Sequence, residues 1–270
     1  MSYLARVVAD SITDQGVRLT TVEVTMPRIV LAEQNTHRVF SRNTASSRAI
    51  PVKTRCDSIE QNPFVPAAFG KNQKGMQSTE LLDVDINRQA EAIWREALAD
   101  SLKHARKLAE LGVHKQYANR LTEPFSWVTQ LVTATDWENY FNLRCHKDAQ
   151  PEIKIAAELT RDAINQSFPV LKKPGQWHLP LVSADISDPV VAAKVSVARC
   201  AAVSYEKHGI TKTVDEELAR HDMMLKSGHM SPFEHQAVVG SESSMRYIGN
   251  FRAPWVQYRK TLPGEAIFEG

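Results

Sequence analysis

One alternating segment near the N-terminus constrains the fold more than any other part of the chain. Residues 18–26 (RLTTVEVTM) alternate apolar and polar side chains, which is typical of a half-buried β-strand. Pro27 interrupts this pattern, and the apolar run 29–32 (IVLA) that follows is suited to burial. The segment therefore predicts a packed strand that gives rigid support to whatever comes next, as a functional site requires.

A dense polar run comes next. Residues 37–48 (HRVFSRNTASSR) gather guanidiniums, an imidazole, hydroxyls and an amide. Arginine forks match phosphate oxygens, while hydroxyl and amide groups can select the edge of a planar heterocycle. The run therefore favours a nucleotide as ligand over an acidic protein surface. The alternative is a solvated, basic start of a helix.

Composition limits the class of protein. The chain has 270 residues with 43% hydrophobic content, enough for a full core in one large domain or two small ones. A net charge of +2 is too small for nucleic-acid binding by bulk attraction. Cys56, Cys145 and Cys200 fit neither a disulfide framework nor a zinc ribbon. With no signal peptide pattern and no run of roughly 18 apolar residues, we expect a soluble cytoplasmic protein in a reducing compartment.

Helices are expected to dominate the remaining chain. Apolar positions recur at helical spacing from about residue 86 to Gly112 and predict the longest helix. Thr-x-x-Glu patterns at 135–138 and 213–216 predict helices that begin with capping boxes. Residues 51–77 lack periodicity and predict a long loop that could act as a lid.

The ends and buried faces of these helices are also predicted. The helix after Thr135 should end at Arg144, and the helix after Thr213 should end at Gly228. Two more helices are expected, one from Pro151 and one over 190–203. The helix after Thr135 is expected to point Trp137, Tyr140, Phe141 and Leu143 inward, and the helix from Pro151 is expected to run through Ile153, Ala156 and Leu159.

Residues outside the polar run could also bind a metal or act as a nucleophile. Segment 229–235 (HMSPFEH) holds two histidines six residues apart around Pro232, which is not the spacing of a zinc helix, so we expect no metal. A satisfied polar turn is the alternative for this segment. Cys145 lies beside Arg144 and His146 and is the best thiolate candidate, although an inert cysteine at a helix end is the stronger interpretation. A Gly-rich phosphate cradle and a nucleophile elbow are both absent from the sequence.

Four blocks together resemble the flavin-dependent thymidylate synthases. The signature of that family matches His37-Arg38, seven residues, then Ser46 and Arg48, with the inner Ser41 and Asn43 preserved. The other matching blocks are Asn142-Leu-Arg144 with Ala149-Gln150-x-Glu152-Ile153, then Gly228-His229-x-Ser231-Pro-Phe-Glu-His235, and Ala202-Val-Ser-Tyr205.

The chain departs from the family in block order and in three residues. The last two blocks usually precede the signature strand, so the chain resembles a circular permutation, which is tolerated when termini lie close together. Thr36 stands in place of the first signature arginine, Thr44 in place of a glutamate, and Glu33 in place of a glutamine near the pyrimidine. Segment 250–260 (NFRAPWVQYRK) matches none of these family blocks.

The resemblance implies an α+β fold, with residues 1–270 as a single domain and a small mixed or antiparallel sheet packed by several helices. It implies a homotetramer that uses FAD, NADPH and methylenetetrahydrofolate to convert dUMP to dTMP, without nucleic-acid or membrane partners. The implied FAD contacts are His37, Arg38, Asn43, Asn139, His229, Ser231 and Glu234. The implied nucleotide contacts are Glu33, Thr44, Ser46, Arg48, Arg120 and Arg144.

The resemblance makes Arg144 and Ser46 the catalytic candidates. Arg144 matches the arginine that the family places at the uracil edge, where a fixed cation can stabilise developing negative charge. Two other functions stay open. A flavin- and folate-dependent hydroxymethylase acting on dUMP or dCMP is compatible with Thr36 and Thr44. A non-catalytic nucleotide- or RNA-binding protein would use the same arginines without flavin.

Overall fold

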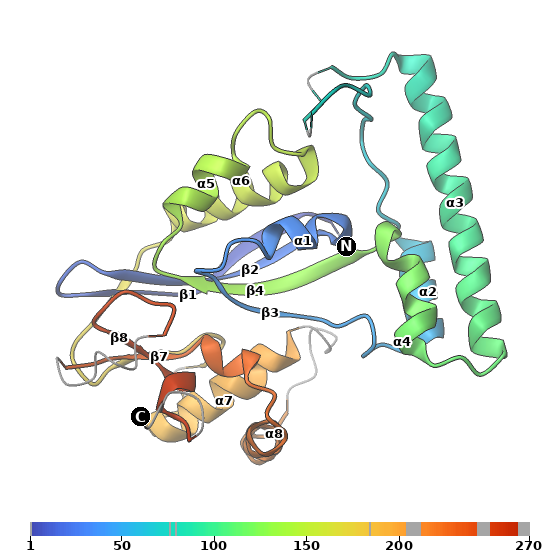
Figure 1. Ribbon diagram of the computed structural model, residues 1–270. Coiled ribbons are helices and arrows are strands. Elements are labelled where there is room, and N and C mark those ends of the chain that lie inside the picture. Colours follow the sequence, from blue (N-terminus) through green and yellow to red (C-terminus); the bar gives the residue numbers. More distant parts are fainter. Residues whose placement is uncertain are drawn as a thin grey trace, which may run out of the picture.

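A mixed five-stranded sheet forms the centre of the computed structural model, which describes residues 2–75, 77–78, 80–183, 185–203, 212–241 and 249–263 (Figure 1). The strand order is β3-β4-β2-β1-β5. The bounds are β1 Leu4–Thr13, β2 Arg18–Pro27, β3 Ser41–Thr44, β4 Trp127–Ala134 and β5 Val170–Lys172. Strand β5 pairs parallel to β1, while the other neighbours are antiparallel. The α+β class and the small mixed sheet are thus confirmed.

Strand β2 lies in the middle of this sheet and is covered on both faces. On one face Val22, Val24 and Met26 pack against Ile153 and Ala156 of α6 (Pro151–Gln166). The other face meets a second, antiparallel sheet with the order β6-β7-β8. The expectation of a half-buried strand was therefore wrong. The polar positions of β2 are threonines and a glutamate, which are buried through hydrogen bonds rather than exposed to water.

The second sheet brings the C-terminal half of the chain beneath the first. Its strands are β6 Trp177–His178, β7 Ala237–Val239 and β8 Trp255–Gln257. Trp255 is fully buried, and its indole N–H donates to the carbonyl oxygen of Val17 at 3.0 Å. Short 3-10 helices flank this sheet, η3 Ser231–Glu234 and η5 Tyr258–Thr261. Segment 250–260 is thus an integral part of the fold.

Helices cover both sides of the central sheet. In Figure 1, α5 (Glu138–Arg144) and α6 lie above it, and α7 (Pro189–Ala202) and α8 (Val214–Ser227) lie below it. The longest helix, α3 (Val84–Glu110), stands at one end together with α2 (Val52–Gln61) and α4 (Lys115–Ala118). Three short helical segments complete the described elements, η1 Arg28–Val30, α1 Leu31–Gln34 and η2 Asn119–Phe125.

Most helix predictions are confirmed. Helix α3 ends just before Gly112, whose φ of 78° is the left-handed conformation that glycine tolerates. Helix α8 begins with a complete capping box between Thr213 and Glu216 and ends at Gly228, which has φ 71°. Pro151 occupies the first turn of α6, and α7 covers the predicted apolar segment.

Other helix predictions were wrong in part. The predicted loop 51–77 contains α2, whose Cys56 and Ile59 are buried against α3. Thr135 does not cap α5, because its hydroxyl donates to the neighbouring Asp136 carboxylate at 2.7 Å. Leu143 was expected to point inward but is 53% exposed.

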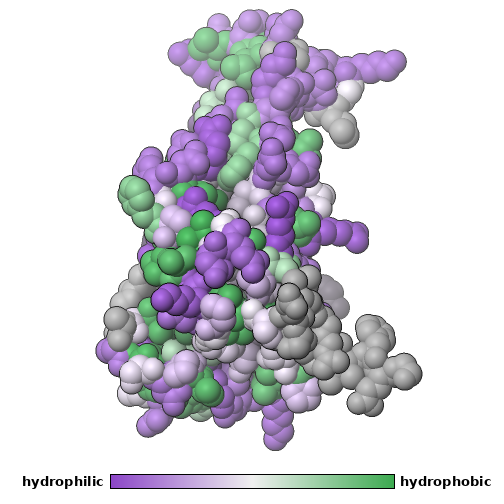
Figure 2. All heavy atoms as spheres, turned by 90° about the vertical axis from the view of Figure 1, so that its left-hand side faces the viewer, coloured by the Kyte–Doolittle hydropathy of each residue, from purple (hydrophilic) through white to green (hydrophobic). Residues whose placement is uncertain are grey.

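The face of the molecule drawn in Figure 2 is predominantly polar with scattered apolar groups. Figure 2 looks at the left-hand side of Figure 1 and shows small apolar groups separated by polar side chains. Among the described helices, none has the length and apolar character needed to cross a membrane.

Candidate active site

A cavity of about 470 Å³ brings the signature run and segment 229–235 together. Asn43 and Thr44 of β3, with Arg48 after it, line one wall, while His229 and the first residue of η3, Ser231, line another. Ser231 and Asn43 thus share one site although they are nearly 190 positions apart in the sequence. Its volume falls within the range of roughly 300–1,000 Å³ typical of small-molecule sites.

Direct hydrogen bonds fix the two walls to each other. The Ser231 hydroxyl donates to Asn43 Oδ1 at 3.2 Å, and Asn43 Nδ2 donates to the carbonyl oxygen of Cys200 in α7 at 2.9 Å. Gln130 of β4 donates to the Thr44 hydroxyl at 2.7 Å. Asn43 therefore holds β3 against both C-terminal segments, which gives the cavity a rigid floor.

The charge of this cavity is positive. Arg48 is exposed, and among the described residues its guanidinium has no hydrogen-bond or ion-pair partner. Arg220 of α8 lines the same cavity, with Met223 and Met224 beside it. Sequence analysis missed these three residues, although positions 220, 223 and 224 share one face of α8. Two guanidiniums at one cavity suit a phosphate group.

A second group of predicted residues gathers around Arg144 at the end of α5. Arg144 Nε donates to His37 Nε2 at 3.0 Å, and Arg144 Nη2 donates to the Thr36 hydroxyl at 3.1 Å and the Glu33 carbonyl oxygen at 3.3 Å. No described residue engages Nη1. The guanidinium is therefore held on one edge and open on the other, which suits the recognition of a ligand edge.

His37 must be neutral to accept this hydrogen bond. Burial, then the positive charges of Arg144 and Arg42, lower the pKa of His37 to about 4. The His37 ring packs edge-on against Tyr140, with ring centroids 4.8 Å apart. A neutral imidazole thus connects the signature run to α5 at physiological pH.

Glu234 is held by the C-terminal segment rather than left open. Arg259 of η5 forms an ion pair with Glu234. The fully buried Gln257 amide donates to the Ser41 hydroxyl at 2.8 Å and to the Glu234 carbonyl oxygen at 3.0 Å. Burial raises the pKa of Glu234, while Arg259 opposes that shift. Segment 255–261 therefore positions the predicted flavin contact Glu234 against β3.

Some predicted residues lie outside both groups. Arg120 forms an ion pair with Glu123 at 2.8 Å, and Glu123 also binds Arg28 at 3.1 Å. Asn139 and Arg38 are exposed, and the Ser46 hydroxyl accepts the Arg48 backbone N–H at 3.3 Å. Ser204 and Tyr205 of the Val-Ser-Tyr block lie outside the described residues. Within one chain, Arg120 and Asn139 do not line the cavity.

The cysteines are poor nucleophiles. Burial raises the pKa of Cys145 despite the nearby Arg161, and Arg144 turns toward His37 instead. Burial raises the pKa of Cys200 to about 12. Within the described ranges, no cluster of three or more His, Cys, Asp or Glu side chains is placed to hold a metal ion.

The match to known proteins covers the first two sequence blocks. The Thy1 family, described as thymidylate synthase complementing protein, matches residues 17–170, and the chain belongs to this family. The flavin-dependent thymidylate synthase of Thermosipho melanesiensis is 31% identical over 139 residues, which is 50% of this chain and 57% of that protein. The chain therefore spans less than two thirds of this relative, and the match leaves segment 229–235 outside the family region.

Solved structures share the fold. The UMP/dUMP methylase PolB from Streptomyces cacaoi, solved with 5-Br UMP and with 5-Br dUMP, superposes with a TM-score of 0.51 at 15% identity. Each comparison covers 63% of this chain and 90% or 91% of the PolB chain. The likeness supports the α+β architecture derived above.

Three buried histidines predict acid sensitivity. Burial is the main cause that lowers the pKa of His37 to about 4 and those of His178 and His235 to about 3, from 6.5. As the pH falls through about 6.5, these histidines take up protons in the unfolded chain but stay neutral in the folded chain. Their contribution to the free energy of unfolding is therefore complete above about pH 6.5 and decreases below it. We expect a loss on the order of 2 kcal/mol per histidine near pH 5.

The measurement is denaturant unfolding at a series of pH values from about 8 to 5. His178→Gln should reduce the slope of stability against pH, because it removes one titrating group. A free energy of unfolding that is constant across this range would show that these histidines are not buried in the neutral form.

Proposed function

We propose that this protein catalyses flavin-dependent transfer of a one-carbon unit from methylenetetrahydrofolate to C5 of dUMP, giving dTMP. The convergence of Asn43, Thr44 and Arg48 with His229 and Ser231 in one positively charged cavity carries this proposal. The family match supports the chemistry, although it covers only part of the relative.

The donor set of the cavity fits a nucleotide cofactor. The His229 imidazole, the Asn43 amide and the Ser231 hydroxyl can bind phosphate and ribityl oxygens of the cofactor, while Arg48 is left for the substrate. FAD would be held by His37, Arg38, Asn43, Asn139, His229, Ser231 and Glu234. When bound, flavin reduced by NADPH supplies the reducing equivalents, and the protein binds, orients and polarises.

The substrate contacts are divided between phosphate and base. Arg48 binds the phosphate, assisted by Ser46 and by Arg120. Arg144 presents its free Nη1 to the pyrimidine edge and stabilises negative charge on the ring, while Glu33 and Thr44 complete the nucleotide contacts. Because Arg120 and Asn139 do not reach the cavity in one chain, a neighbouring subunit would supply them in a homotetramer.

The geometry gives Thr36 a distinct role. Its hydroxyl accepts from Arg144 at 3.1 Å, so an arginine at position 36 would place a second cation against Arg144. Thr44 similarly accepts from Gln130. The two threonines therefore position their neighbours, and they leave the cavity at Thr44 and the surroundings of Arg144 at Thr36 less charged and roomier than glutamate and arginine would.

The proposed permutation is supported by contacts. Segment 229–235 precedes the signature strand in typical members but follows it here, and Ser231 still reaches Asn43.

We further propose that the protein acts in the cytoplasm.

The activity is tested by product analysis. The protein is incubated with FAD, NADPH, methylenetetrahydrofolate and either dUMP or dCMP, and the products are identified by mass. dTMP from dUMP supports the proposal, whereas a hydroxymethylated product indicates the hydroxymethylase alternative. Nucleotide binding without turnover or bound flavin would indicate a binding protein.

Selectivity should depend on the two threonines. We expect Thr36→Arg combined with Thr44→Glu to change the ratio of dUMP to dCMP turnover, because charge and long side chains return to the pocket. Thr54→Arg is a matched control on exposed α2. Conversion of dUMP alone, at the same rate in wild type and double variant, would contradict altered selectivity.

A further inference from the structure

The loop that carries Arg48 is held from outside rather than by Arg48 itself. This segment, residues 45–50 between β3 and α2, is called the Arg48 loop below. The Arg48 guanidinium has no partner among the described residues, so its position depends on the backbone of the loop. Within the loop, the Ala49 backbone N–H donates to the Ser46 carbonyl oxygen at 3.0 Å, which closes a tight turn. Most of the other carbonyl oxygens of the loop accept hydrogen bonds from side chains elsewhere.

Asn119 makes the central contacts to this loop. It is the first residue of η2 and is fully buried. Its Nδ2 donates to the Ser47 carbonyl oxygen at 2.7 Å and to the Ile50 carbonyl oxygen at 2.8 Å. Both partners are acceptors, so only the NH₂ group of the amide can face them. Asn119 therefore fixes the backbone on both sides of Arg48.

Two cations hold the loop at other carbonyl oxygens. Lys115 Nζ, from the start of α4, donates to the Ala49 carbonyl oxygen at 3.1 Å. Arg28 Nη1, from η1, donates to the Ala45 carbonyl oxygen at 3.1 Å, while its Nε is held by Glu123 at 3.1 Å. Charged donors form stronger hydrogen bonds than neutral ones. Four carbonyl oxygens of a six-residue loop are thus fixed by the side chains of η1, α4 and η2.

These three side chains act through the loop and not on the ligand. Asn119, Lys115 and Arg28 are not among the residues that line the cavity, whereas Arg48 is. Their removal would leave the groups that face the ligand unchanged in kind and would loosen only the position of Arg48. A binding group that is displaced by about 1 Å loses much of its effect, because its supporting contacts fix its geometry.

We propose that Asn119 is a positioning residue, supported by Lys115 and Arg28, that sets the affinity of the site for the substrate phosphate by holding the Arg48 loop. The inference rests on the proposed function, in which Arg48 binds that phosphate. Because these contacts reach the loop and not the base, they should affect the binding of a nucleotide and leave the binding of the nucleoside unchanged.

Binding measurements on the FAD-saturated protein test this role without turnover. Isothermal titration compares dUMP with deoxyuridine, which lacks the phosphate. We expect Asn119→Ala to weaken dUMP binding about tenfold, the scale for a charge-assisted hydrogen bond that is largely lost, and to leave deoxyuridine binding unchanged. Asn119→Asp should weaken dUMP binding at least as much, because a carboxylate of the same shape would face two carbonyl oxygens.

A double variant separates positioning from general stability. If Asn119 acts through Arg48, then Asn119→Ala should cause no further loss of dUMP affinity in a protein that already carries Arg48→Ala. A purely structural role predicts that the two losses add and that deoxyuridine binding falls as well. Lys115→Met provides a second test where Asn119→Ala does not fold, and Lys115→Arg, which keeps a charged donor, should retain dUMP affinity.

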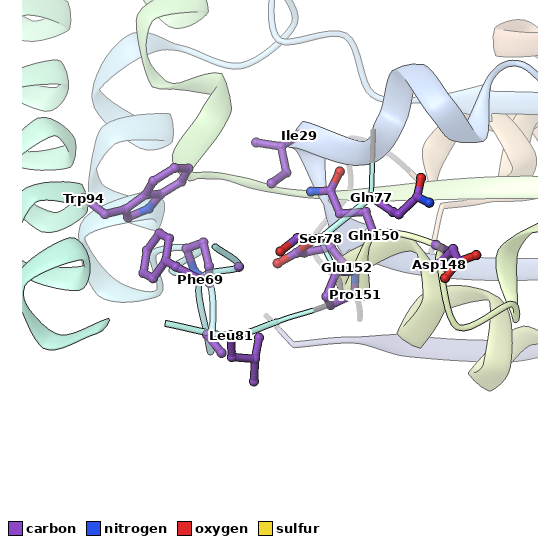
Figure 3. A pocket seen from close by; sticks show the side chains of 14 residues that line it. Ile29, Phe69, Gln77, Ser78, Leu81, Trp94, Asp148, Gln150, Pro151 and Glu152 are labelled. Atoms are coloured by element: carbon purple, nitrogen blue, oxygen red, sulfur yellow. The ribbon is translucent and has the colours of Figure 1, made fainter. Parts of the chain in front are cut away.

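Asn87→Ala is a matched control that releases a different loop. The Asn87 Oδ1 accepts the Phe69 backbone N–H at 2.9 Å. Figure 3 shows Phe69 beside Trp94 at a separate cavity of about 320 Å³, between α3 and the start of α6, that shares no lining residue with the cavity of Arg48. Asn87→Ala should therefore leave dUMP affinity unchanged.

Each outcome supports or overturns the inference. It is wrong if folded Asn119→Ala and Lys115→Met bind dUMP as tightly as the wild type does, if deoxyuridine binding falls equally, or if the losses add in the double variant. Wild-type protein that binds dUMP no more tightly than deoxyuridine would overturn the phosphate assignment of Arg48 in the proposed function, and this inference with it.

Discussion

Arg144→Ala should lower the rate of dUMP methylation by roughly a hundredfold or more, the scale for loss of a preorganised charge-stabilising donor. Arg144 is held by His37, Thr36 and the Glu33 carbonyl oxygen, with Nη1 left for the pyrimidine. Removing it therefore deletes a fixed cation at the point where negative charge develops. Arg144→Lys should fail in large part, because a point charge does not reproduce a planar fork.

The measurement is kcat and KM for dUMP together with FAD content. FAD content should stay near the wild-type value, which separates loss of chemistry from loss of the His37 contact. Arg161→Ala is a matched control, since Arg161 is exposed on α6 and pairs with Asp162. Near-normal turnover of Arg144→Ala would show that the catalytic group lies elsewhere.

Arg48→Ala should raise KM for dUMP by about ten- to a hundredfold with a smaller change in kcat. A hydrogen bond to a charged group contributes about 1.5–3 kcal/mol, and Arg48 lines the cavity with its guanidinium available. The same variant should bind deoxyuridine, which lacks the phosphate, about as well as the wild type does.

Arg88→Ala provides the comparison for Arg48, because Arg88 is an exposed arginine of α3 paired with Asp85. Its KM should be unchanged. Equal KM values for wild type and Arg48→Ala would remove Arg48 from the phosphate site.

Regular periodicity decided which elements could be predicted. Strand β2 and helices α3, α6, α7 and α8 carry uninterrupted patterns, and their positions were predicted correctly. Strand β1 was missed because its register against β2 shifts between Val7 and Ala9, which breaks the period of two in residues 4–13. Helix α2 was missed although Val52, Cys56 and Ile59 follow helical spacing, because Pro51 and a polar composition masked it.

The residues of the site also fall into those that could be assigned from the sequence and those whose positions depend on long-range packing. The family resemblance assigned Asn43, His229 and Ser231 to flavin and Thr44 and Arg48 to the nucleotide, and the structure brings these five residues to one cavity. Local sequence could not reveal Arg220 or Arg259, because their positions depend on how α8 and η5 pack against η3. Arg259 contacts Glu234 only after β7 and β8 pair, which is a long-range event.

Flavin binding by the assembled protein tests the central claim most directly. The purified protein is saturated with FAD, separated by size-exclusion chromatography, and monitored at roughly 450 nm, where oxidised flavin absorbs. We predict one FAD per chain, eluting with an oligomer, and reduced binding in Asn43→Ala because that change uncouples β3 from Ser231 and α7. A folded, colourless monomer that gains no flavin absorbance would contradict the account.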